Sequence, residues 1–394
     1  MSLEHTYRGL RVIDLSENIA GPLACMILGD LGADVVKVEP PGRGDATRAL
    51  SPRMGGTSTV FLTLNRNKRS AAIDIRTPAG RDAVLCVARD ADVVVESFRP
   101  GVADRLGLGF DDFTLVSPDL VHCSISAFGE GPLGHDRPGY DALVQAFTGM
   151  MEMTGDPAGQ PARAAPSVID ISTGLWASIA IQAALARRRL SPGPQRVEST
   201  LVDAGFFLLC HQIMGYLGSG TFPPRLGSAG PSTAPYQAFR TADGTIMIAA
   251  ATDRLFGRLA DALDVPELAA DPRFATVGGR VAARDELAGL IEQRLRKQGS
   301  DYWLARIADA GVPAGPVNDL AAALAHPLTA ERGIVRPADD GAIAGLQQVR
   351  LPIDSGGDCR LPQPPALGEH TTQVLAEAGL AAEEIDALTR ARKG

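Results

Sequence analysis

The chain has 394 residues, 45% of them hydrophobic, a size at which one hydrophobic core usually gives way to two domains. Its formal net charge of −8, with no local stripe of Lys and Arg, argues against a nucleic-acid partner. The N-terminus is polar and no run of about 18 uncharged apolar residues occurs, so we expect a cytoplasmic protein with no membrane partner.

The five cysteines and six histidines are widely separated. They include no Cys-x-x-Cys pair and no His-Glu-x-x-His motif, which are spacings typical of zinc sites. Cysteines without a disulfide framework fit a reducing cytoplasm. We therefore expect no metal site.

Strands and helices alternate along the first half of the chain. The predicted order is strand 10–15, helix 20–31, strand 33–38, strand 71–75, helix 78–89, strand 92–96 and strand 120–126. A short strand at 165–169 and a long apolar helix at 171–190 follow, and Ser191-Pro192-Gly193-Pro194 ends that helix. Such alternation predicts a parallel sheet covered by helices on both faces.

The second half changes character. Its predicted elements are a helix at 202–217, a Gly/Pro/Ser-rich stretch at 218–235, a hairpin of strands 236–241 and 245–250, and helices at 253–263, 281–297, 300–310 and 371–378. We therefore expect an α/β fold with a Rossmann-like large domain and a smaller inserted α/β domain. The large domain would combine residues 1–200 with a returning segment at 326–394, and the small domain would span 235–325 after a linker at 201–234.

Asp170 lies where the predicted strand meets the long helix. A carboxylate at a helix start faces free backbone N–H groups and the positive end of the helix dipole, so we expect it to stay ionised and well positioned. Such a group can act as a nucleophile. Asp is also a preferred N-cap, and the alternative is that Asp170 only begins the helix.

A literal Gly-x-Gly-x-x-Gly pattern spans residues 129–134 directly after a predicted strand. A dinucleotide site requires this pattern to open a helix that receives the pyrophosphate. Pro132 and Pro138 interrupt the segment, and no helix can begin before about Tyr140. We expect no NAD site.

Nearly the whole chain resembles one family, the family III CoA-transferases, also called the CaiB/BaiF family, which includes formyl-CoA transferase and the carnitine CoA-transferase. The segments that carry this resemblance are 10–15 with 20–22, 31–39, 65–70, 98–102, 105–107, 139–141, Asp170 with Thr173-Gly174, and 310–313. The resemblance implies transfer of CoA from an acyl-CoA thioester to a carboxylic acid, with coenzyme A as acyl carrier. It also implies an intertwined homodimer.

The resemblance also assigns roles to residues. The family's nucleophile is matched by Asp170, which would attack the thioester to give a mixed anhydride and then carry CoA as an aspartyl thioester. Oxyanion donors would be backbone N–H groups first and side chains second. The positions that match CoA-binding residues are occupied by Ala20, Ile73, Arg76, Ser97, Phe98, Arg105 and Tyr140.

Some positions depart from formyl-CoA transferase. A glutamine near its thioester is matched by Ile19, which cannot donate a side-chain hydrogen bond, so oxalate and formate are not the expected substrates. A run of glycines is matched only by a loop with Gly227, Ser228 and Gly230. A CoA-contacting arginine is matched by Pro40, so part of the nucleotide anchoring must come from elsewhere.

Two alternative functions stay open from the sequence. An α-methylacyl-CoA racemase of the same superfamily uses a histidine where this chain has Tyr140, a poor base near neutral pH, and His135 lies out of register. A catalytically silent CoA-binding homologue would dispense with the nucleophile, whereas Asp170 and its Thr173-Gly174 context are present.

Overall fold

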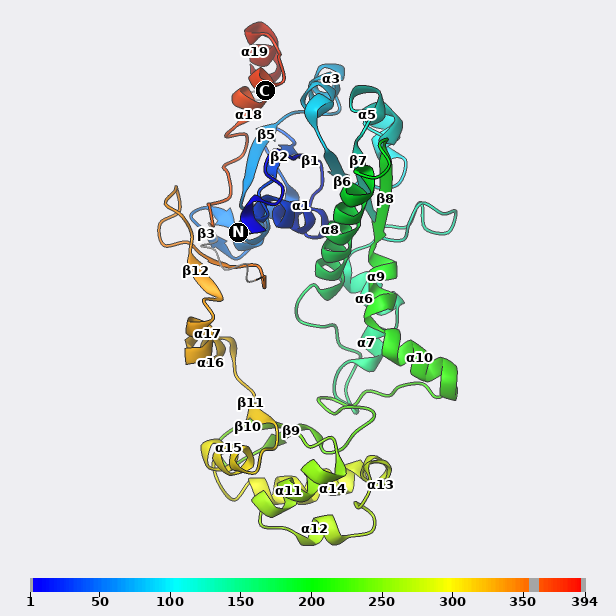
Figure 1. Ribbon diagram of the computed structural model, residues 1–394, viewed down its shortest axis with the longest axis vertical. Helices are drawn as coiled ribbons and strands as arrows, with labels where there is room; N and C mark the ends of the chain where they lie inside the picture. The colour runs from blue at the N-terminus through cyan, green and yellow to red at the C-terminus, as the bar shows by residue number, and fades with distance from the viewer. Residues whose placement is uncertain (1–2, 354–360, 391–394) are drawn as a thin grey trace. The chain divides into compact units, whose positions relative to one another are not determined.

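The computed structural model describes residues 3–353 and 361–390 (Figure 1). The chain divides into two compact units. The first contains residues up to 148, 164–210 and the segment from 330 onward; the second contains 149–163 and 211–329. Residues 149–163 join the second unit because they pair with its later segments. The Gly227 N–H donates to the Gly155 carbonyl over 2.9 Å, and Arg225 lies 3.4 Å from the Glu152 carboxylate.

The first unit is built on a six-stranded sheet with the strand order β5-β2-β1-β6-β7-β8. Its strands are β1 (Arg11–Asp14), β2 (Asp34–Glu39), β5 (Lys68–Ala72), β6 (Val93–Glu96), β7 (Val121–Ser126) and β8 (Gln195–Thr200). All neighbouring strands pair in parallel, which confirms the predicted parallel sheet. The order reverses direction between β1 and β6, and in such sheets ligands bind beyond the carboxyl ends of the strands at this reversal.

Helices cover both faces of this sheet. On one face α3 (Pro78–Val87), α5 (Phe110–Val116) and α18 (Thr371–Glu377) pack on Ile13 and Val94. On the other face α1 (Ala20–Asp30), buried along its whole length, packs on β1, β2 and β6. Successive strand residues point to opposite faces, so the same strands supply apolar side chains to both layers of helices. The long helix α8 (Val168–Arg188) lies against α1 and β8.

The rest of the first unit consists of short elements. They are η1 (Leu3–His5), η2 (Ala46–Ala49), β3 (Arg53–Met54), β4 (Thr57–Ser58), α2 (Thr59–Leu64), η3 (Ala88–Asp90), α4 (Val102–Leu106), α6 (Asp141–Phe147), α9 (Leu201–Leu208), β12 (Val335–Pro337), β13 (Gln347–Val349) and α19 (Ala382–Arg390).

The second unit is a small antiparallel sheet with helices. The sheet has the order β11-β10-β9, from β9 (Tyr236–Arg240), β10 (Thr245–Ala249) and β11 (Ala314–Pro316). The predicted hairpin is therefore correct. Its helices are α7 (Met150–Met153), α10 (Cys210–Ser219), α11 (Asp253–Ala262), α12 (Glu267–Ala270), α13 (Val277–Ala282), α14 (Arg284–Leu295), α15 (Ser300–Asp309) and α16 (Leu320–Ala325), with α17 (Pro327–Glu331) at the boundary. Its core is formed around Phe239, Phe274 and Trp303.

Several predicted elements differ from the structure. Residues 165–169 form no strand, because α8 already begins at Val168. The sequence analysis did not predict β8, because this strand is polar and has no apolar run. It lies at the edge of the sheet and pairs with β7 alone, so it does not need to be buried on both sides. The predicted helix 202–217 is divided at Leu209 into α9 and α10. The predicted helix 281–297 is likewise interrupted at Ala283, between α13 and α14.

Helix α8 also bears on the membrane question. By length and composition alone it could cross a membrane, as could α9 and α10 taken together. However, 44% of the most apolar stretch of α8 is buried inside the chain, against elements that include α1 and β8. The core helix of a globular domain meets the same criteria of length and hydropathy.

Candidate active site

A cavity of about 200 Å³ lies at the carboxyl ends of the strands, where the sheet order reverses. Its lining consists of residues 17–21, 97–100, 125–127 and 137–140 together with Asp170 and Leu201. The first three of these segments lie after β1, after β6 and at the end of β7, so the parallel sheet itself gathers them at one edge. The cavity brings together six residues expected from the sequence to form the site: Ile19, Ala20, Ser97, Phe98, Tyr140 and Asp170.

A second cavity, of about 490 Å³, adjoins the first, and Glu17 and Phe98 line both cavities. It contains two more of the expected residues, Ile73 and Arg76, and also Pro40. Arg105 lines neither cavity, although its helix neighbours on α4, Val102 and Leu106, line this one. Its guanidinium instead lies close to Gly101, where an added Cβ would be 3.3 Å from Nη1.

Asp170 is the third residue of α8, and a different carboxylate caps that helix. Oδ2 of Asp141 accepts hydrogen bonds from the N–H groups of Ile169 (2.8 Å) and Asp170 (3.2 Å). Asp141, buried at the start of α6, also accepts from the Gln145 amide, and Oε1 of Gln145 in turn accepts from the N–H of Ala164. The free N–H groups of α8 are therefore occupied by Asp141. Capping is not the role of the Asp170 side chain, which lines the cavity.

The charge state of Asp170 differs from the expectation. Burial, together with the nearby Asp141 carboxylate, raises the pKa of Asp170 to about 7. The helix dipole was expected to keep this side chain ionised, but lost hydration and a like charge outweigh it. A carboxyl group with so strongly raised a pKa, lining a cavity, is a candidate functional group.

Two arginines that the sequence analysis did not single out, Arg99 and Arg137, line the same cavity. The Arg137 guanidinium lies 4.7 Å from the ring centre of Phe128 and 5.1 Å from that of Phe147. Among the residues that the structure describes, neither guanidinium forms an ion pair with a carboxylate. In the sequence each arginine directly precedes a proline, Arg99 within segment 98–102 and Arg137 just before segment 139–141. Both segments carry the family resemblance, and this proximity could have identified the two arginines as candidate site residues.

The cations of the second cavity are paired instead. Arg76 donates two hydrogen bonds to Asp74, and Arg43 donates to Glu17 with a shortest distance of 3.0 Å. His135, considered as a racemase base, lines neither cavity and lies 2.9 Å from Asp136 through Nδ1. Within residues 3–353 and 361–390, no group of three or more His, Cys, Asp or Glu side chains is arranged to hold a metal ion.

The predicted substrate loop belongs to the second unit and folds back onto β9. The Ala238 N–H donates to Oγ of Ser228 over 3.0 Å, and the Gly230 N–H donates to the Tyr236 carbonyl over 2.9 Å. Gly227 has a φ of 60°, a left-handed conformation that favours glycine. The role of this loop toward the substrate stays a prediction.

Comparison with known proteins assigns the family. The model of "CoA-transferase family III" matches residues 7–371. The chain is 39% identical over 381 residues to succinate–glutarate CoA-transferase from Agrobacterium fabrum, covering 94% of each chain. It is 36% identical over 375 residues to human succinyl-CoA:glutarate CoA-transferase, covering 94% of this chain and 85% of the relative.

A solved structure agrees with these relatives. A CaiB/BaiF family protein from Brucella suis superimposes with a TM-score of 0.84 at 40% identity, covering 94% of this chain and 98% of that protein. Identity at this level, over nearly the full length of several CoA-transferases, is accompanied by the same fold. The chain belongs to CoA-transferase family III and is a CoA-transferase that acts between acyl-CoA thioesters and carboxylates.

Proposed function

We propose that this enzyme transfers CoA from succinyl-CoA or a similar acyl-CoA to a dicarboxylic acid, through covalent intermediates on Asp170. The observation that carries the proposal is the cavity at the carboxyl ends of β1 and β6. It combines one half-buried carboxyl group, Asp170, with two arginines, Arg99 and Arg137. Within the part of the chain that the structure describes, neither arginine forms an ion pair with a carboxylate.

The reaction follows from the chemistry of a carboxylate and a thioester. An ionised Asp170 oxygen attacks the thioester carbonyl carbon, the C–S bond breaks, and CoA leaves as the thiolate, so that a mixed anhydride remains. The thiolate then attacks the Asp170 carbonyl carbon, releases the first acid as a carboxylate and leaves an aspartyl-CoA thioester. The incoming acid takes CoA by the reverse of these steps. Splitting one difficult exchange into such steps is the advantage of nucleophilic catalysis.

The site can assist these steps electrostatically. A carboxyl group with a raised pKa is a stronger nucleophile once it is ionised. The N-terminus of α1 opens into the same cavity at Ala20 and Gly21, and no side chain caps it. Its backbone N–H groups and the positive end of its dipole are suited to stabilise the oxyanion that forms when the thioester is attacked.

The two adjoining cavities suggest how CoA is placed. The thioester end would occupy the smaller cavity beside Asp170, and the nucleotide end would enter the larger one beside Ile73 and Arg76. Arg43 lines the larger cavity three residues after Pro40, and 60% of its side chain is exposed. Its ion pair with Glu17 is largely exposed and therefore weak, so the guanidinium can turn to a CoA phosphate and supply the contact that Pro40 cannot make.

Arg99 and Arg137 support a dicarboxylate as the acid. One carboxylate of such an acid reacts, and the other must find a cation when it leaves water. Relatives with 36% to 39% identity are named for succinate and glutarate, which are acids of this class. Glutarate is therefore our first choice of acceptor, with succinyl-CoA as donor.

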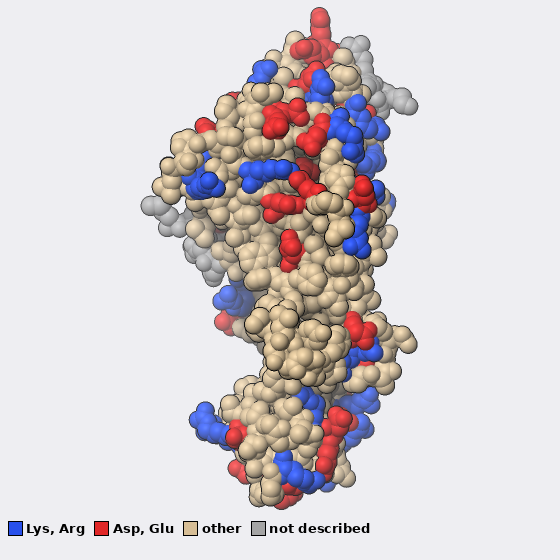
Figure 2. Space-filling model, turned by 90° about the vertical axis from the view of Figure 1, so that its right-hand side faces the viewer, with Lys and Arg blue, Asp and Glu red and all other residues tan. Residues whose placement is uncertain are grey.

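We also propose that the enzyme is a homodimer, supported by exposed apolar side chains on α8 and α9. Leu175 and Ile179 of α8 and Phe206 and Phe207 of α9 are exposed in the single chain. Figure 2, in which the right-hand side of Figure 1 faces the viewer, shows charged side chains over the upper part of the first unit and mostly uncharged atoms below them. Exposed apolar surface of this kind is typical of protein interfaces.

The test is a comparison of the wild-type enzyme with Asp170→Ala. Purified enzyme is incubated with succinyl-CoA and glutarate, and glutaryl-CoA is quantified by mass spectrometry. We expect the variant to lose transfer by roughly 10³-fold or more, because the nucleophile is gone, while calorimetry shows that it still binds CoA. A mass increase that matches bound CoA should appear on wild-type peptides containing Asp170. An Asp170→Ala enzyme that transfers CoA would refute the covalent mechanism.

A further inference from the structure

Two buried lysines, Lys37 of β2 and Lys68 of β5, lie directly behind the wall of the catalytic cavity. The side chain of Lys37 is 1% exposed and that of Lys68 is 0% exposed. Asp14 of β1, also buried, lies between them: its Oδ2 is 3.7 Å from Nζ of Lys37 and 2.9 Å from Nζ of Lys68. The two ammonium groups thus share one carboxylate beneath the carboxyl end of the sheet.

Each lysine also donates to a backbone carbonyl, and the two carbonyls flank one short segment. Nζ of Lys37 donates to the Ser16 carbonyl over 2.7 Å, and Nζ of Lys68 donates to the Pro22 carbonyl over 2.9 Å. Between these carbonyls lie residues 17–21, and every one of them lines the cavity that contains Asp170. We call residues 17–21 the wall segment.

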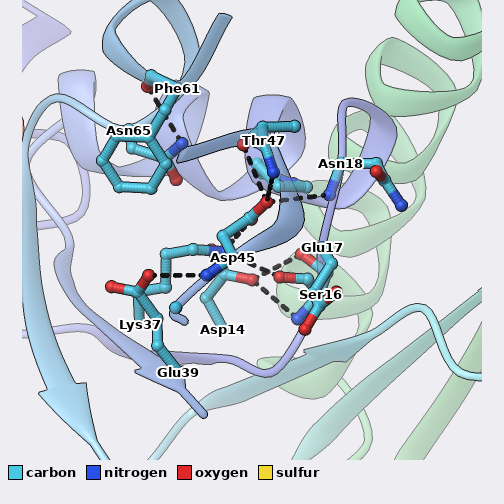
Figure 3. Close-up of polar contacts among 12 residues, drawn as sticks. Asp14, Ser16, Glu17, Asn18, Lys37, Glu39, Asp45, Thr47, Phe61 and Asn65 are labelled. Atoms are coloured by element: carbon cyan, nitrogen blue, oxygen red, sulfur yellow. Dashed lines mark hydrogen bonds and ion pairs between the residues drawn. The ribbon is translucent and has the colours of Figure 1, made fainter. Parts of the chain in front are cut away.

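Further contacts hold the wall segment from the same side. Oδ1 of Asp14 accepts from both the N–H and the hydroxyl group of Ser16, which precedes the segment. Asp45 forms an ion pair of 2.9 Å with Lys37 through Oδ2, and its Oδ1 is 3.5 Å from the Asn18 N–H. Figure 3 shows Asp14, Lys37 and Asp45 converging on Ser16 and Asn18.

The wall segment has a backbone that requires such support. Asn18 adopts a φ of 70°, a left-handed conformation that is uncommon for residues other than glycine. At Gly21 an added Cβ would lie 2.3 Å from the Ser16 side chain, so the turn admits only glycine there. A residue held in a sparsely populated conformation persists only where its surroundings fix it, and such residues cluster at functional sites.

We infer that Lys37 and Lys68, bridged by Asp14 and supported by Asp45, are positioning residues that hold the wall segment against the reacting thioester. The inference rests on the proposed function and adds to it the group that fixes one side of the reaction cavity. Stability alone is a weak reason for such a network, because well-packed apolar residues often stabilise a protein as well as a buried ion pair does.

The wall segment can affect two quantities. It carries the start of α1, whose N–H groups are the proposed oxyanion donors, and a displacement of about 1 Å in such groups is enough to lower a rate by roughly 10²-fold. It also closes the cavity in which the mixed anhydride forms. If the segment moves, water can attack the acyl carbon of the anhydride. The bond to the Asp170 oxygen then breaks, Asp170 is regenerated as a carboxylate, and the acid and free CoA are released without transfer.

The experiment compares two matched double variants in the full-length enzyme. Lys37→Met/Asp45→Asn neutralises an ion pair of the network and removes the contact with Ser16. Arg66→Met/Asp30→Asn neutralises another buried ion pair of the same unit, with a contact of 2.7 Å, and neither residue lines the cavity. Both enzymes receive succinyl-CoA and glutarate, and glutaryl-CoA and free CoA are measured together. The ratio of hydrolysis to transfer does not depend on how much of the enzyme is folded.

For Lys37→Met/Asp45→Asn we expect the turnover number for transfer to fall by roughly 10²-fold with the KM for succinyl-CoA within about threefold of wild type. We also expect the ratio of hydrolysis to transfer to rise several-fold. The control double variant should keep the wild-type ratio. A network variant that keeps the wild-type ratio of hydrolysis to transfer overturns the inference.

A second variant covers the case in which the double variant does not fold. Asp45→Asn alone keeps an oxygen acceptor at Oδ1 for the Asn18 and Thr47 N–H groups and removes only the charge of Asp45, the nearer of the two carboxylates that face Lys37. The same rise of the ratio is expected, and a wild-type ratio contradicts the inference. An inactive wild-type enzyme would refute the proposed function itself, and the inference with it, whereas an unchanged ratio in an active enzyme refutes the inference alone.

Discussion

Asp141 and Asp170 are two carboxylates with different tasks, separated by 29 residues in the chain and joined at one helix start. Asp141 accepts the N–H groups of α8 and is buried, whereas Asp170 lines the cavity with a pKa raised to about 7. Neighbouring carboxylates placed in different environments commonly divide the roles at an active site. The position of Asp170 near a helix start was predictable from its flanking residues, but its charge state was not, because it depends on burial and on the distant Asp141.

The raised pKa predicts the pH dependence of the reaction. In the proposed mechanism Asp170 attacks as the carboxylate, so kcat/KM for succinyl-CoA should rise with pH and level off above an inflection near 7. Asp141→Asn removes the like charge while it keeps an oxygen that accepts the N–H groups, and the inflection should move to lower pH. Initial rates measured from pH 5 to 9 provide the check. Asp112→Asn, on the distant helix α5, is the control and should keep the wild-type profile.

The same carboxyl group affects stability, and its sign is opposite to that of most acidic residues. The pKa of Asp170 rises from 3.8 to about 7 on folding, so the folded state binds the proton more tightly than the unfolded state. The contribution of the protonated group is fully present below pH 4, and it is lost as the pH rises toward 7. Asp170→Asn does not ionise, so its advantage over the wild type should grow through this window.

Thermal unfolding measures this effect directly. At pH 8 we expect Asp170→Asn to unfold at a higher temperature than the wild type, with a gain in the free energy of unfolding on the order of 1 kcal/mol or more. At pH 4 the two proteins should differ little. Equal differences at both pH values would show that the substitution acts through something other than ionisation of Asp170.

At the level of elements, the crossing of α1 and α8 sets the position of Asp170. The two helices approach closely at Gly174, one turn after Asp170, where an added Cβ would lie 2.6 Å from the Ala20 carbonyl oxygen and 3.1 Å from the Leu23 side chain. A backbone oxygen cannot move aside without moving α1. Gly174 therefore allows the first turn of α8 and the first turn of α1 to border the same cavity.

Gly174→Ala should force these helices apart. We expect it to destabilise the protein by about 1–3 kcal/mol, as is usual for overpacking, and to lower the transfer rate more than the fraction of folded enzyme explains. Urea unfolding and transfer assays provide the two measurements. Gly289→Ala in α14 is the matched control, because nothing lies within 4 Å of an added Cβ there; it should be neutral or slightly stabilising. If Gly174→Ala were as stable and as active as Gly289→Ala, the close crossing would not matter.

The elements show where periodicity succeeds and where it fails. Strands β1, β2, β6 and β7 are largely buried and rich in Val and Ile, and the sequence places them within about two residues. Strand β5 begins three residues earlier than expected, at Lys68, because that charged residue is paired with Asp14 in the interior. Strand β8 has no apolar run, and its pairing with β7 becomes visible only when the sheet is assembled.

At the scale of the whole molecule, the strand order explains why distant segments form one site. Residues that follow β1, β6 and β7 meet at one sheet edge, and α8 adds Asp170 there. Alternating elements predicted a parallel sheet, and the family resemblance named six of the 18 residues that line the cavity. Neither the alternation nor the resemblance could reveal that Arg99 and Arg137 lie in the same cavity as Asp170. Nor could they show that both arginines lack an ion-pair partner among the residues that the structure describes, since this depends on contacts between segments far apart in sequence.

The homodimer is the prediction that belongs to the whole molecule. Ile171, Leu175 and Ile179 are spaced by four residues on α8 and are 40%, 47% and 53% exposed, so they form one apolar stripe on the single chain. Burial of this stripe against a second copy would remove it from water, whereas a charge placed on it would then have to be buried without a partner. Leu175→Glu/Ile179→Glu should therefore shift the enzyme from dimer toward monomer, as measured by sedimentation velocity over a range of concentrations.

Leu115→Glu on α5, where the leucine is 83% exposed and not part of this stripe, should leave the association state unchanged. If the α8 variant sedimented as the wild type does, the stripe would not lie in the interface, and a wild-type enzyme that is monomeric at micromolar concentration would contradict the dimer itself.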